Sequence, residues 1–275
     1  MMASALRVFL SPAIGRRALA GIEGVVPASR LGVRPQPETI PTGIPQVDEL
    51  TGGVPRSGLT EIFGPASSGR TSLLLALMAQ ATAREEVCAL VDASDAFDPH
   101  SAAVAGVDLQ RVLWVRGAEV SSFKFQVSRR RLETRNVKRE TFSRVELALR
   151  AADLLLQAGG FGLVVMDLGD IPPAIARRVP LTSWFRFRRA VENTATALVV
   201  VEQEASAKSC ASLVLRTEQS ALSSQQSAKA GSKPSHARLL HGIQIEVEVL
   251  NSRMLQRKPS RAATTTFESR SSWFG

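Results

Sequence analysis

The chain has 275 residues, a formal net charge of +9 and two cysteines, and 44% of its residues are apolar. This composition is typical of a globular protein with one core domain, and it excludes a largely disordered chain and a disulfide scaffold. No apolar run approaches the roughly 20 residues that a membrane-spanning helix needs, so no membrane partner is expected. Cys88 and Cys210 are expected to be free, reduced thiols in a cytoplasmic protein.

Residues 1–38 are predicted to form an N-terminal arm outside the core. They show no hydrophobic period, and several Gly and Pro residues interrupt them. We expect an extension that packs on a neighbour or stays mobile.

A core domain is predicted over residues 39–255, where short apolar runs alternate with helical patterns. This alternation is typical of βαβ units around a mainly parallel sheet, whose strands are buried on both faces. Strands are predicted at Leu59–Phe63, Cys88–Asp92, Val112–Val115, Leu163–Asp167, Ala197–Val201, Ser212–Arg216 and Gly242–Leu250. Helices are predicted at Thr71–Ala83, Arg144–Ala158 and Leu181–Glu192. A loose loop is expected at 218–237 and a flexible C-terminal tail at 256–275.

A glycine-rich segment joins the first of these strands to the first helix, which is the context of a phosphate-binding loop. Its backbone N–H groups and the helix N-terminus would face one anion. Arg70 stands where the usual pattern has Lys, and its planar guanidinium is bulkier than an ammonium group. The alternative is that the glycines serve packing alone. The candidate nucleotide-binding residues of the loop are Gly64, Pro65, Ala66, Ser67, Ser68, Gly69, Arg70, Thr71 and Ser72.

Further motifs along the chain fit one known family. They are Pro41-Thr42-Gly43, Thr60 to Gly69, Ala89 to Ala93, Phe97-Asp98-Pro99, Leu163 to Asp167 and Val199 to Gln203. With these motifs, residues 40 to about 250 resemble the bacterial RecA recombinase family. The resemblance implies an α/β fold: a RecA-like P-loop core with a central, mostly parallel β-sheet flanked by helices, plus flexible N- and C-terminal extensions.

The resemblance also implies ATP and Mg²⁺ as cofactors. Asp98 would accept a hydrogen bond from the adenine amino group, and Gln203 would sense the γ-phosphate. Thr71 and Asp167 would lie at the metal.

Departures from the family pattern fall at the same site. The resemblance places a water-orienting Glu two residues after Asp92, where Ser94 stands, and Ser is no general base. Asp95 is adjacent, but a one-residue shift is expected to point its side chain elsewhere. Ser101 replaces the Tyr that stacks on adenine. We therefore assign no catalytic residue and expect weak ATP binding with slow or absent hydrolysis.

Two alternatives stay open. One is an active DNA-dependent ATPase or recombinase in which Arg70 and Asp95 replace the missing groups. The other is a protein-interaction module that takes no nucleotide.

A basic insertion at about 121–143 suggests an acidic polymer as partner. Between Lys124 and Arg144, eight basic residues against two acidic ones give a net charge of +6. Arginine clusters neutralise phosphates, so DNA, single-stranded or without sequence preference, is the predicted ligand; a solvated loop is the other interpretation. The DNA-binding candidates are Arg129, Arg130, Arg131, Arg135, Lys138 and Arg139.

Two phrases, Ala151 to Gly162 and Trp184 to Ala190, resemble the ImuA-type RecA-like accessory proteins of the bacterial translesion mutasome. This resemblance implies a role in DNA repair, the SOS response and translesion synthesis, with polymerase-associated proteins as partners. The next predicted strand begins only nine positions after Gln203, so a DNA loop of the RecA filament looks truncated, and self-association stays open.

Aromatic residues in the tail are candidates for docking on a partner, and others are predicted to be buried on one face of a helix. Trp273 and Phe274 in the tail are candidates for docking on a partner, unless they fold back on their own domain. Trp184, Phe187 and Val191 are spaced to bury one helix face. No structural metal is expected from the three scattered His residues.

Overall fold

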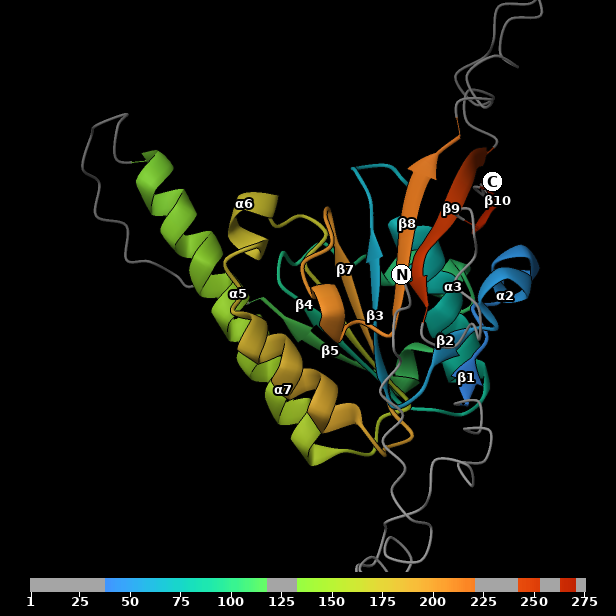
Figure 1. Cartoon of the computed structure of the whole chain (residues 1–275), viewed down its shortest axis with the longest axis horizontal. Helices are drawn as coiled ribbons and strands as arrows, with labels where there is room; N and C mark the ends of the chain where they lie inside the picture. The colour runs from blue at the N-terminus through green and yellow to red at the C-terminus, as the bar shows by residue number, and fades with distance from the viewer. Residues whose placement is uncertain (1–37, 118–132, 221–241, 253–262, 271–275) are drawn as a thin grey trace, which may run out of the picture. The chain divides into compact units, whose positions relative to one another are not determined.

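The computed structural model describes residues 38–117, 133–220, 242–252 and 263–270, with the backbone alone at 133–140, 242 and 270. These ranges build an α/β structure around an eight-stranded sheet (Figure 1). In sheet order the strands are β10 (Ala263–Arg270), β9 (Gly242–Ser252), β8 (Leu213–Gln219), β3 (Gly58–Phe63), β7 (Ala197–Glu202), β6 (Leu163–Asp167), β4 (Cys88–Asp92) and β5 (Val112–Arg116). The β8–β9 and β9–β10 pairs are antiparallel, and all other pairs of this sheet are parallel. The predicted α/β class with a mostly parallel sheet is confirmed.

Helices cover both faces of the sheet. Alternate residues of each strand point to opposite faces, so each strand contributes side chains to two cores. Ile62, Leu90 and Val199 face one core, and Leu59 and Val164 face the other. The first core includes residues of α2 (Pro45–Thr51), α3 (Arg70–Ala83) and α4 (Pro99–Val104). The second includes residues of α5 (Glu133–Ala158), α6 (Pro173–Ala176) and α7 (Leu181–Val191). The short remaining elements are β1 (Thr39–Ile40), β2 (Val54–Pro55), and the 3-10 turns η2 (Leu109–Arg111) and η3 (Lys208–Cys210).

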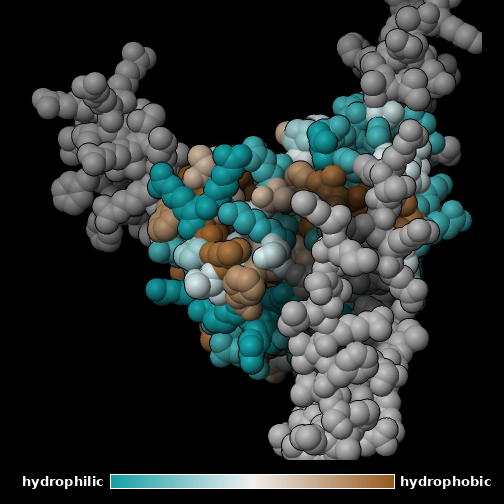
Figure 2. All heavy atoms as spheres, in the orientation of Figure 1, coloured by the Kyte–Doolittle hydropathy of each residue, from teal (hydrophilic) through white to brown (hydrophobic). Residues whose placement is uncertain are grey.

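Helix α5 packs on the sheet through the apolar face that the sequence predicts. Val145, Ala148 and Ala152 are buried in the second core, while Leu154 on the outward side is 68% exposed. Figure 2 shows such apolar residues scattered among hydrophilic ones on the side that carries α5, α6 and α7. The predicted start of this helix at Arg144 is wrong, because residues 133–143 of the predicted basic insertion are also helical. Those residues include good helix formers but lack the apolar period that marked the rest of the helix.

Helix α7 buries the predicted residues. Trp184, Phe187 and Val191 are fully buried, with the two aromatic rings in an edge-to-face contact at 6.1 Å between centroids. The interpretation of this aromatic and arginine-rich segment as a core helix is confirmed.

The flexible tail predicted at 256–275 is wrong for residues 263–270, which form β10. Strand β10 pairs with β9 along its whole length, with Phe267 opposite Ile245. Phe267 is 7% exposed and belongs to the first core. The loose loop at 218–237 is likewise wrong for 218–219, where β8 continues. Trp273 and Phe274 lie outside the described residues, as does the N-terminal arm up to residue 37.

No helix of the described ranges is both long enough and apolar enough to span a membrane. Cys88 and Cys210 are buried and are not joined in a disulfide, and burial raises the pKa of the Cys88 thiol to about 12.

Candidate functional site

The predicted site lies where four neighbouring parallel strands end. The order β3-β7-β6-β4 puts their carboxyl ends at one edge of the sheet, which is where open α/β sheets bind ligands. Phe63 pairs with Glu202, and Asp167 pairs with both Val201 and Asp92. The glycine-rich loop, Asp167 and Gln203 are thus brought together, as the sequence predicts.

The loop turns from β3 into α3 with two glycines that packing requires. A Cβ at Gly64 would lie 2.1 Å from the carbonyl oxygen of Thr217 on β8. Gly69 has a φ of 88°, and a Cβ there would lie 2.2 Å from the Ile245 side chain on β9. The hydroxyls of Ser68 and Thr217 are 2.9 Å apart. Packing alone therefore accounts for both glycines, and β8 and β9 anchor the loop.

Arg70, the first residue of α3, turns its side chain into the protein. The residue is 8% exposed, and its Nη1 donates to the carbonyl oxygens of Glu202 at 2.7 Å and Gly169 at 3.1 Å. Burial lowers the pKa of the guanidinium, which the charges of Asp167 and Asp170 partly offset. Arg70, which stands in place of the usual Lys of the loop, thus donates hydrogen bonds to carbonyl groups just after β6 and at the end of β7.

Asp167 and Thr71, the candidate metal ligands, line one cavity. Asp167 Oδ1 accepts the N–H of Gly169 at 2.8 Å. Burial raises the pKa of Asp167 to about 6, although the hydrogen bond from Gly169 opposes this rise. A cation beside this carboxyl is favoured electrostatically, and Arg70 already supplies one. Within the described ranges, no three His, Cys, Asp or Glu residues cluster as metal ligands.

The cavity has a volume of about 170 Å³. It extends from the first turns of α3 to the segment between β4 and α4 and to the end of β6. Its lining includes residues that were not site candidates in the sequence analysis: Leu74, Leu75, Ala96, Phe97, Gly169, Asp170 and Val201. Ligand pockets usually measure about 300–1,000 Å³. Arg70 is hydrogen-bonded to the carbonyl groups of Glu202 and Gly169, and its charge acts on Asp167. The residues of this cavity therefore do not fit ATP and Mg²⁺ in the arrangement that they adopt.

Asp98, the adenine candidate, caps the N-terminus of α4. Its carboxylate accepts the backbone N–H groups of His100 and Ser101 and the Ser101 hydroxyl. These bonds, led by that of the hydroxyl, hold the pKa of Asp98 below its usual value. Phe97 is the aromatic residue that lines the cavity, and its place just before Asp98 was the signal that could have found it.

Asp95 is committed to an ion pair. Both of its carboxylate oxygens accept hydrogen bonds from Arg116 at 2.7 Å, and these bonds lower its pKa. The carboxylate of Asp92 accepts the N–H groups of Ser94, Ala96 and Phe97 and the indole N–H of Trp114. A carboxylate paired with a guanidinium is a poor proton acceptor, so Asp95 does not fit the role of a substitute base.

Gln203 also bonds to protein groups. Its Nε2 donates to the carbonyl oxygens of Gly169 at 3.1 Å and Ile171 at 3.3 Å. The DNA-binding candidates fall into two groups. Arg135, Lys138 and Arg139 belong to α5, where the structure describes only their backbone, and Arg129, Arg130 and Arg131 lie outside the described residues.

Comparisons with known proteins agree with these motifs. A family model described as the RecA N-terminal domain matches residues 24–119. The protein named RecA of Mesorhizobium japonicum is 28% identical over 193 residues, which cover 63% of this chain and 46% of that protein. RecA of Thermus aquaticus is 48% identical over 88 residues, covering 30% and 26% respectively. The chain thus spans less than half the length of these relatives.

A solved structure shares the fold. The crystal structure of the RadB recombinase aligns with a TM-score of 0.53 and 16% sequence identity, covering 84% of this chain and 96% of that one. This chain is therefore similar in sequence to the RecA N-terminal domain over residues 24–119, and it shares its α/β fold with the RadB structure.

Proposed function

We propose that this protein is a RecA-family DNA-repair protein that acts by binding DNA and protein partners, and that it does not turn over ATP. One observation carries the proposal. At the position of the water-orienting Glu stands Ser94, and the neighbouring carboxylate, Asp95, is held in a two-bond ion pair by Arg116. This leaves hydrolysis without the general base that the family uses.

The partners follow from sequence features outside the described side chains. The arginines Arg129, Arg130 and Arg131 would contact the phosphates of single-stranded or non-specific DNA. The resemblance to the accessory proteins of the translesion mutasome supports polymerase-associated proteins as partners, with Trp273 and Phe274 as docking residues. The proposal places this work in the cytoplasm, in the response to DNA damage.

An assay of ATP hydrolysis with saturating oligo(dT) tests the proposal. We expect turnover far below about 1 per second, the low end of typical enzyme rates. The active-ATPase alternative instead requires a rate near that value, lost in Asp95→Asn and kept in the neighbouring control Ser94→Ala. DNA binding is measured on the same samples by fluorescence anisotropy. A protein that binds no DNA at low salt would contradict the proposed function.

A further inference from the structure

Three segments of the candidate site meet at a single carbonyl group. The oxygen of Gly169, in the loop after β6, accepts hydrogen bonds from Arg70 Nη1 and from Gln203 Nε2, both at 3.1 Å. The same Arg70 nitrogen reaches the carbonyl of Glu202 at the end of β7, and that carbonyl also accepts the N–H of Gly64 at 3.3 Å. The phosphate loop, α3, β6 and β7 are therefore joined through protein atoms alone.

The positive charge at this point is offset by acidic residues of the protein. Asp167 and Asp170 are the acidic residues whose charges act on the Arg70 guanidinium. A buried charge is costly unless it is paired and hydrogen-bonded. An arginine side chain remains protonated at all ordinary pH values, so Arg70 supplies a permanent positive charge beside the acidic ends of the strands.

The side chain also fits its surroundings closely. A Cβ at Gly169 would lie 3.0 Å from Asp167 Oδ1 and 3.4 Å from Arg70 Nη1. The remaining cavity of about 170 Å³ is smaller than the roughly 300–1,000 Å³ of ordinary ligand pockets. The Nζ of a lysine lies one bond nearer the backbone than Arg Nη1, so lysine would reach the two carbonyl groups less well.

We propose that Arg70 is a built-in cation that stands in for a nucleotide-bound metal and holds the phosphate loop to β6 and β7 in one arrangement. The loop is then a structural element, and ATP with Mg²⁺ neither assembles this edge of the sheet nor controls the binding of DNA. Only the statement about DNA binding rests on the proposed function.

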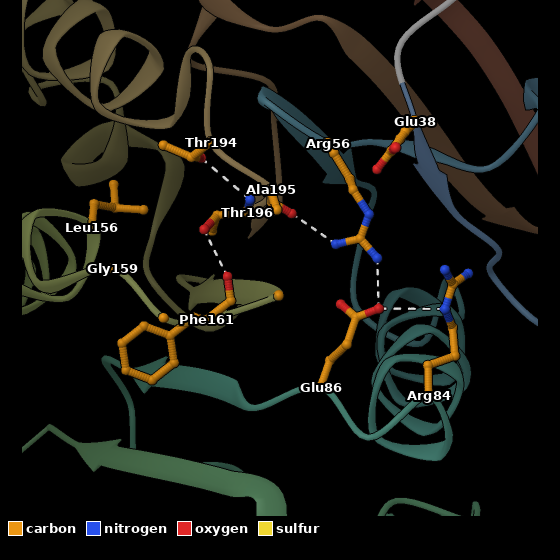
Figure 3. A pocket seen from close by; sticks show the side chains of 12 residues that line it. Glu38, Arg56, Arg84, Glu86, Leu156, Gly159, Phe161, Thr194, Ala195 and Thr196 are labelled. Carbon is orange, nitrogen blue, oxygen red and sulfur yellow. Dashed lines mark hydrogen bonds and ion pairs between the residues drawn. The ribbon is translucent and has the colours of Figure 1, made fainter.

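Arg56 offers a matched control for a substitution at Arg70. It is also 8% exposed, its Nη1 donates to the carbonyl oxygen of Ala195 at 2.7 Å, and its Nη2 donates to Glu86 at 2.5 Å. Figure 3 shows Arg56 reaching Ala195 and Glu86 in a separate cavity, where Arg84 also contacts Glu86. Arg56→Lys therefore removes a similar buried guanidinium away from the candidate site.

The test is a calorimetric titration of the full chain with ATP, with and without Mg²⁺. For the wild type and Arg56→Lys, we expect no saturable, Mg²⁺-dependent binding up to millimolar ATP. Arg70→Lys should open the cavity and gain Mg²⁺-dependent affinity by at least about tenfold, a change of about 1.4 kcal/mol. Thermal melting with ATP and Mg²⁺ gives a second readout, since ligand binding raises the melting temperature.

Two results would overturn the inference. One is Mg²⁺-dependent binding of ATP by the wild type at micromolar concentration, and the other is a folded Arg70→Lys variant with unchanged affinity. If both Arg70→Lys and Arg70→Ala fail to fold, the wild-type titration decides. Anisotropy with labelled oligo(dT) should be unaffected by ATP in the wild type. Absence of DNA binding in every sample would contradict the proposed function and leave the titration result intact.

Discussion

At the scale of single residues, two glutamates bury carboxyl groups on neighbouring strands. Glu61 on β3 and Glu202 on β7 are each 1% exposed. Glu61 Oε1 accepts the N–H groups of Ser206 and Ala207, and Glu202 Oε1 accepts the Ser206 hydroxyl. The Oε2 atoms of both have no hydrogen-bond partner among the described residues. Burial raises the pKa of both, that of Glu202 to about 8, with the charge of Glu61 adding to the rise.

This burial makes stability depend on pH. Glu202 holds its proton up to pH about 8 in the folded protein, against an ordinary value of 4.5. The folded state binds more protons than the unfolded chain between these values, so the free energy of unfolding falls as pH rises from about 4.5 to about 8. Glu202→Gln should flatten this decline in melting temperatures measured from pH 5 to 9. Glu146→Gln, at an exposed carboxyl, should not, and an equal slope in Glu202→Gln would refute this assignment.

The position of a candidate-site residue could be predicted where it depends only on the end of a strand. The orientation of a side chain could not be predicted. Asp167 and Gln203 follow apolar strands, so their common edge could be predicted from the sequence. The inward turn of Arg70 depends on carbonyl groups 99 and 132 residues further along the chain. No local pattern signals such a contact.

At the scale of elements, burial on both faces decided which strands could be predicted. The bounds of β4 and β6 match the predicted ranges to the residue, because both are continuous apolar runs. Strand β10 was missed, since it reads as Ala-Thr-Thr-Thr-Phe-Glu-Ser-Arg and buries one large apolar side chain. Its pairing with β9 is a tertiary contact at the edge of the sheet.

Strand β10 yields a test of that pairing. Phe267→Ala should lower the free energy of unfolding by about 3 kcal/mol or more, the usual cost of removing a buried Phe side chain. Thr266→Ala, at the exposed neighbour on the same strand, serves as the control and should change stability little. Urea denaturation of both variants measures the difference. Equal stabilities would show that residues 263–270 contribute little to the core.

At the scale of the whole molecule, DNA binding could come from a local cluster of arginines or from the net positive charge of the chain, and variants can tell these two causes apart. The segment from Lys124 to Arg144 carries +6 of a total charge of +9. Replacing Arg129, Arg130 and Arg131 by Ala should weaken binding to oligo(dT) and reduce the slope of log affinity against log salt. On single strands the slope should fall by up to about 0.7 for each phosphate that the variant no longer neutralises. Anisotropy at several salt concentrations measures this slope.

A variant of equal net charge makes this prediction specific. Replacing Arg177, Arg178 and Arg189 by Ala removes three exposed arginines of the α6–α7 region and gives the same net charge. Arg177 already contacts Glu204, so its charge is partly neutralised by a neighbour. If the salt slope falls equally in both triple variants, net charge governs binding and the cluster at 129–131 has no special role. If the slope falls only when Arg129, Arg130 and Arg131 are replaced, the DNA contacts lie in that segment, because counterion release counts local phosphate contacts.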